Sequence, residues 1–184
     1  FDRLTVKIEC DGAIEGIVAE SNAQGKVRGY VRNPLAETAE FSHEIKGIIG
    51  KGMFNVIREA GFDVGSYREP YHGSVPLYTG EIAEDFAYYL LQSEQIPSAV
   101  LLGVALQKEE PYIKAAGGVM LQVMPGANDH IITMIEDTIL HAPNITQTIS
   151  EGCTPEDLVK LALGIIDYEI LEEKQAHKTD DLGE

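Results

Sequence analysis

Residues 79–106 read TGEIAEDFAYYLLQSEQIPSAVLLGVAL, and the spacing of apolar side chains changes within this stretch. The first part places four apolar residues on one face of a helix: Ile82, Phe86, Tyr89 and Leu90. The second part, 99–106, is apolar on both alternating sides, which is typical of a strand covered from two directions. We therefore predict a helix over 79–93, with Thr79 as its N-cap and Pro97 beyond its end, and then a central strand.

The residues that follow predict a partner for that strand. The segment 113–124 has the same two-sided apolar character, and Lys108-Glu109-Glu110-Pro111 has the composition of a hairpin loop. We expect the two strands to pair and to form the middle of a sheet.

The N-terminal part of the sequence predicts three strands in succession. Apolar and polar residues alternate over 4–8, and the segments 14–19 and 27–32 have similar character. Asp11-Gly12 and the segment 22–25 supply turns between them. Three adjacent strands joined by short turns indicate an antiparallel meander.

The remaining periodic segments are a strand near 53–58 and two helices. Ile131, Ile135 and Ile139 recur at a spacing of four, and a second helix begins at Thr154-Pro155. The apolar stripe of that second helix is Leu158, Leu161, Ala162 and Ile165. Because strands come first and helices mostly later, the fold class is α+β, with antiparallel sheets packed against helices.

The length of 184 residues fits one domain with a tail. We expect the domain over 1–171 and a polar linker or tail over 172–184, where large apolar residues are almost absent. The first residue is Phe1 rather than Met, so we expect the domain to be incomplete at its N-terminus.

Composition excludes several classes of partner. The formal charge of −16 and the absence of a basic segment argue against nucleic acid, and no stretch approaches the ~20 apolar residues of a membrane helix. Cys10 and Cys153 lack the spacing of a zinc site or a disulfide framework, which favours a cytoplasmic protein with reduced thiols.

Candidate chemistry is confined to a few carboxylates. Glu81, Glu84 and Asp85 cluster near the start of the predicted helix, where a carboxylate pair serves acid–base hydrolysis. The alternative is a solvated acidic face, since negative charge is favourable at a helix N-terminus. The histidines never fall at helical spacing: His43, His72, His130, His141 and His177. We assign no catalytic, cofactor-binding or metal residue.

Several motifs occur in an order that resembles the heat shock protein 33 family. They are Gly25–Tyr30 with Asn33-Pro34, Tyr71–Leu77 leading into Thr79–Asp85, Ala87–Tyr89, Ser93–Val100 with Leu102–Val104, Ala115–Gly118 and Gln122–Ala127. This resemblance covers most of residues 3–170. It implies the fold of the N-terminal domain of that family and the function of a holdase chaperone. Such a protein binds unfolding proteins without ATP under oxidative stress and is not an enzyme.

The resemblance also implies parts that this sequence does not contain. Family members carry a C-terminal redox domain with C-x-C and C-x-x-C motifs that hold zinc when reduced, so no cofactor is expected within these 184 residues. The residues that usually precede the Phe1 region, including a strand and a helix that complete the core, are missing too. We therefore expect either a fragment of a longer protein or a second copy or companion segment that supplies the missing surface. The residues that contact clients are not identified by the sequence. The alternatives are a small-molecule enzyme that uses the helix carboxylates and an interaction module with one dedicated partner.

Overall fold

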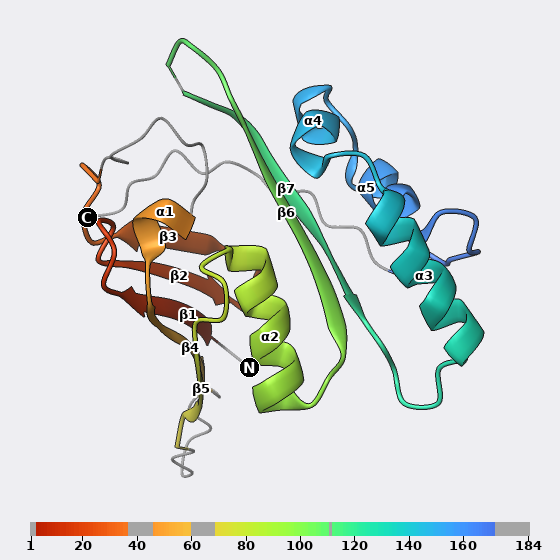
Figure 1. The fold of residues 1–184 in the computed structure, drawn as a ribbon, viewed down its shortest axis with the longest axis horizontal. Helices are drawn as coiled ribbons and strands as arrows, with labels where there is room; N and C mark the ends of the chain where they lie inside the picture. The colour runs from red at the N-terminus through yellow and green to blue at the C-terminus, as the bar shows by residue number, and fades with distance from the viewer. Residues whose placement is uncertain (1–2, 37–45, 60–68, 111, 172–184) are drawn as a thin grey trace.

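The computed structural model describes residues 3–36, 46–59, 69–110 and 112–171, and it contains two antiparallel sheets with a helix between them (Figure 1). The first sheet consists of β1 (Arg3–Cys10), β2 (Gly16–Asn22), β3 (Val27–Val31), β4 (Gly52–Glu59) and β5 (Tyr71–Pro76). The second consists of β6 (Ser98–Leu106) and β7 (Ile113–Gln122). The helices are α1 (Lys46–Ile49), α2 (Ile82–Glu94), α3 (Asp129–His141), α4 (Ile145–Ser150) and α5 (Pro155–Leu163).

The first sheet has the order β3-β2-β1-β4-β5, with every neighbouring pair antiparallel. The predicted meander is confirmed as β1, β2 and β3, and its second turn is held by Asn22, whose Oδ1 accepts the backbone N–H groups of Gln24 and Lys26. The strand predicted near 53–58 is β4, which pairs with β1. Strand β5 was not predicted from the sequence.

Helix α2 packs across the first sheet and forms the main core with it. Phe54 of β4 lies with its ring centroid 5.6 Å from those of both Phe86 and Tyr89 on α2. The buried members of this core are Ile8, Ile14, Ile49, Phe54, Val56, Val75, Tyr89 and Leu90. Burial of each large apolar side chain contributes about 1.5–3 kcal/mol, so this core holds α2 in place. The helical period of 79–93 is thereby confirmed.

Strands β6 and β7 form a two-stranded hairpin of their own, on the other side of α2 from the first sheet (Figure 1). The prediction that they pair is confirmed. The prediction that they form the middle of a sheet is wrong, since in the part of the chain that is described no further strand joins them. The pattern misled because one face of the hairpin is apolar yet exposed.

The other face of the hairpin packs on α4 and α5 and forms a small second core, made of Ala105, Ile149 and Leu158. Gly103 allows the close approach, because a Cβ there would lie 2.9 Å from Ile149 Cδ1 and 3.0 Å from the Thr146 nitrogen. Small residues on one face of the hairpin therefore determine how near α4 can pack.

The three C-terminal helices begin at well-defined caps. Asn128 caps α3 and Asn144 caps α4, which was not predicted. Helix α5 has the expected capping box between Thr154 and Asp157. The prediction that Ile165 continues its apolar stripe is wrong: the helix ends at Leu163, and Ile165 is 89% exposed.

The tail predicted over 172–184 lies outside the described residues, so the domain boundary stays a prediction. None of the described helices is long and apolar enough to cross a membrane.

Candidate interaction surface

The start of α2 differs from the prediction. The first helical residue is Ile82, and the N-cap position is occupied by Glu81, whose side chain makes no capping bond. Thr79 lies before the helix, where its Oγ1 accepts the N–H of Glu81 at 3.1 Å. Thr79 is therefore not the N-cap.

Asp85 is a structural residue of the turn before α2. It is 1% exposed, and its carboxylate accepts the backbone N–H groups of Tyr78 at 2.6 Å and of Thr79 and Gly80 at 3.0 Å each. The interpretation as a solvated acidic face is wrong for Asp85, although Glu84 is exposed and Glu81 half-buried. A carboxylate with three backbone donors is stabilised in place without any ion pair.

The three carboxylates do not assemble into a candidate acid–base pair. Asp85 is committed to the backbone, Glu84 faces solvent, and none of the three lines the pockets described below. The geometry therefore gives no support to the hydrolase interpretation.

A buried polar network joins the end of α2 to the first sheet. The Tyr89 hydroxyl donates to Glu94 at 2.6 Å, and the Arg58 guanidinium of β4 pairs with the same carboxylate at 2.8 Å. Arg58 also lies over the Tyr71 ring, 5.5 Å from its centroid. Burial of the Tyr89 ring, with the bond to Glu94, raises the pKa of the hydroxyl to about 12. The network is satisfied internally, and it fixes the C-terminal end of α2 on the sheet.

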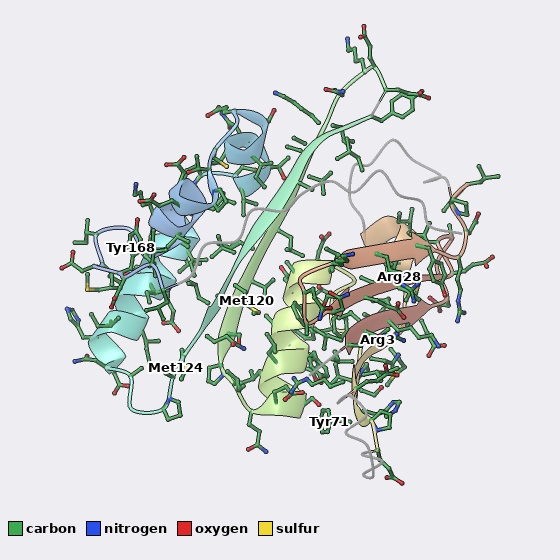
Figure 2. All side chains as sticks on the ribbon, turned by 180° about the vertical axis from the view of Figure 1, so that it is seen from behind. Arg3, Arg28, Tyr71, Met120, Met124 and Tyr168 are labelled. Atoms are coloured by element: carbon green, nitrogen blue, oxygen red, sulfur yellow. The ribbon has the colours of Figure 1, made fainter. Side chains whose placement is uncertain are left out.

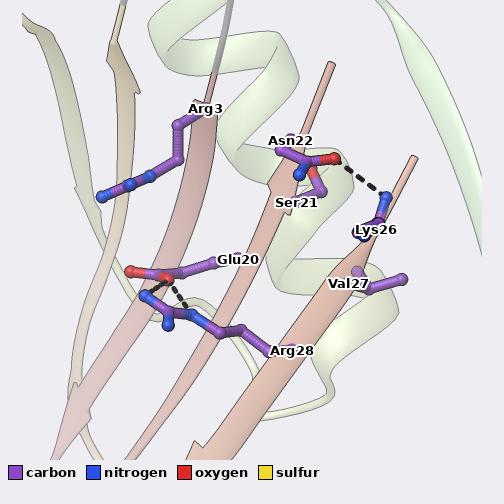
Figure 3. Close-up of a pocket in the computed structure, with 7 residues that line it drawn as sticks. All are labelled: Arg3, Glu20, Ser21, Asn22, Lys26, Val27 and Arg28. Atoms are coloured by element: carbon purple, nitrogen blue, oxygen red, sulfur yellow. Dashed lines mark hydrogen bonds and ion pairs between the residues drawn. The ribbon is translucent and has the colours of Figure 1, made fainter. Parts of the chain in front are cut away.

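One pocket, of about 290 Å³, gathers basic side chains on the first sheet (Figure 3). It is lined by Arg3, Glu20, Ser21, Asn22, Lys26, Val27 and Arg28. The sequence showed no basic segment, and the sheet brings these cations together from separate strands. Arg28 pairs with Glu20, and Arg3 pairs with Glu59 at 3.6 Å. Because acidic partners offset two of the cations, the pocket is a weak candidate for an anion site.

A second pocket of about 290 Å³ lies between β6 and the C-terminal helices. It is lined by Leu101, Leu102, Ile139, Ala142, Pro143, Asn144, Ile145, Thr146 and Leu161. A third, of about 350 Å³, lies beside β2 and β3 and shares Glu20 and Arg28 with the first. Neither holds a group that the sequence analysis singled out for catalysis.

Among the described residues, the cysteines and histidines do not come together as a metal site. Cys10 packs against the main core and Cys153 against the second core, so the two thiols belong to different parts of the fold. Burial raises the pKa of Cys10, which disfavours the thiolate that zinc requires. Among the described residues no three metal-ligating side chains come together. His43 and His177 lie outside those residues. The zinc of the family's redox domain thus has no fitting ligand set here.

The hairpin carries a row of exposed apolar side chains. Residues of β6 alternate in burial: Gly103 and Ala105 are buried against α4, while the side chains between them point to the opposite side. That side, which we term the apolar face, comprises Leu102, Val104, Leu106, Ile113 and Met120. Each of these residues is between 43% and 66% exposed. Exposed apolar patches of this kind mark sites of interaction with other molecules.

The apolar face is also free of charge. Strand β6 contains no charged residue, and in β7 the single one is Lys114, which donates to the Ser150 carbonyl at 2.5 Å. Figure 2 shows Met120 on this hairpin and Met124 just beyond the end of β7, both well away from Arg3 and Arg28 on the first sheet. In a chain with a net charge of −16, the five residues of the apolar face thus form an uncharged surface.

Sequence reasoning missed this surface because apolarity on both sides of a strand was interpreted as burial on both sides. The useful signal was the size of the residues. In β6 the small residues Gly103 and Ala105 alternate with large ones, which indicates that one face is fitted closely to a helix. This pattern of residue sizes does not show whether the opposite, apolar face of the hairpin is covered.

Two sheets, a central helix and a hairpin with an exposed apolar face define the class of protein: an α+β domain that presents an apolar surface. The sequence profile of the Hsp33 protein family matches residues 1–179, and the chain belongs to this family. The motif resemblance found in the sequence is thereby confirmed.

Individual relatives agree with the profile. The 33 kDa chaperonin of Listeria monocytogenes serovar 1/2a is 46% identical over 176 residues, which cover 92% of this chain and 58% of that protein. The 33 kDa chaperonin of Enterococcus faecalis is 41% identical over 175 residues, 93% of this chain and 57% of that protein. The chain thus spans somewhat more than half the length of these relatives.

A solved structure confirms the fold. The crystal structure of the 33 kDa chaperonin (heat shock protein 33 homolog) from Thermotoga maritima superposes with a TM-score of 0.74 at 37% identity. The match covers 88% of this chain and 55% of that one. The predicted α+β class with antiparallel sheets and helices is correct.

Proposed function

We propose that this chain is the polypeptide-binding part of an ATP-independent holdase chaperone and is not an enzyme. The observation that carries the proposal is the apolar face of the hairpin, which is exposed, uncharged and continuous across two paired strands. Unfolding proteins expose apolar side chains in no fixed order. A non-directional attraction between apolar surfaces suits such clients, because it requires no particular sequence.

The charge of the chain supports the same proposal. A net charge of −16 keeps a complex of chaperone and client in solution by mutual repulsion, while the uncharged apolar face supplies the attraction. The kinship with proteins named 33 kDa chaperonin adds support. We further propose a cytoplasmic location and activation under oxidative stress through a zinc-binding cysteine domain outside these residues.

The test is light scattering from a thermally unfolding client enzyme, with and without this chain and the oxidised longer protein that contains it. We expect scattering to fall as chaperone is added, equally with and without ATP. An acidic globular protein of similar size is the control for charge alone. If neither form suppresses scattering at molar excess over the client, the proposal is wrong.

A dedicated partner is distinguished from general client binding by using several unrelated clients. A holdase binds each of them when unfolded and none of them when folded. Binding to a single folded protein, with no effect on the others, supports the module with one dedicated partner instead.

A further inference from the structure

We draw no further inference here: the strongest candidate, the pocket of about 290 Å³ between β6 and the C-terminal helices, carries nothing because the chain spans little more than half the length of its relatives and nothing in the structure shows what covers this pocket.

Discussion

The hydroxyl of Tyr89 and the carboxylate of Glu94 lie 2.6 Å apart near the end of α2, and both are enclosed by the first sheet. Arg58 of β4 completes the arrangement from the other side of the carboxylate. The hydrogen bond lies within α2, and the ion pair between Arg58 and Glu94 links the end of the helix to the sheet. A Cβ at Gly73 of β5 would collide with the Tyr89 hydroxyl, so glycine is required for this approach.

This network predicts a loss of stability at high pH. The pKa of Tyr89 is raised to about 12 from the ordinary 10, so the folded state retains a proton that the unfolded state loses. The stabilisation is fully present below pH 10 and is lost as the pH rises from about 10 to about 12. Urea denaturation measures the free energy of unfolding at pH 8 and at pH 11. Between these two pH values, the free energy of unfolding should fall less for Tyr89→Phe than for the native chain. An equal loss in both proteins contradicts the assignment.

Replacement of Asp85 should destabilise the protein through the turn before α2. Asp85→Ala leaves three backbone N–H groups without their acceptor, which costs about 3 kcal/mol in the free energy of unfolding. Asp85→Asn retains one carbonyl acceptor and should cost about 1 kcal/mol. Glu84→Ala, on the exposed side of the same helix, is the control and should change stability by less than about 0.5 kcal/mol. A similar effect at both positions would show that Asp85 is not a structural residue.

The contact between the hairpin and α4 is tested by two glycines on the same face. At Gly103 a Cβ would lie 3.0 Å from the backbone nitrogen of Thr146, whereas at Gly117 its nearest neighbour is Ile149 Cδ1 at 3.4 Å. Gly103→Ala should therefore lower the free energy of unfolding by about 1–3 kcal/mol, and Gly117→Ala by less than about 1 kcal/mol. Thermal unfolding of the two variants measures the difference. The reverse order would show that α4 is not seated as described.

The apolar face is tested by polar substitution. Leu102→Gln combined with Leu106→Gln removes two large apolar contacts, each worth about 1 kcal/mol when half its area is buried by a client. The concentration of chaperone needed to suppress aggregation should rise by at least about tenfold. Leu140→Gln combined with Ile165→Gln changes two apolar residues that are even more exposed but lie elsewhere, and it should have little effect. Equal effects of the two pairs would show that the apolar face is not the client surface.

The elements with strong local signals were predicted correctly. The helix predicted over 79–93 follows from four apolar residues at helical spacing, and the capping box at Thr154 marks the start of α5. Each of these signals consists of residues that are close together in the sequence. Strand β5 and helix α4 were missed. Strand β5 contains a proline, a glycine and a histidine in six residues, and α4 is a short helix with two threonines, so neither has a strong intrinsic preference.

The candidate surface was less predictable than the fold. The order and type of most elements, the α+β class and the kinship with Hsp33 proteins are contained in the sequence, because periodicity, turns and ordered motifs are local properties of the chain. The burial of Asp85, the separation of the β6–β7 hairpin from the first sheet and the exposure of Leu102 and Met120 are different in kind. They depend on which distant segments of the chain pack on a given face. The sequence of a single strand does not determine whether another segment covers it.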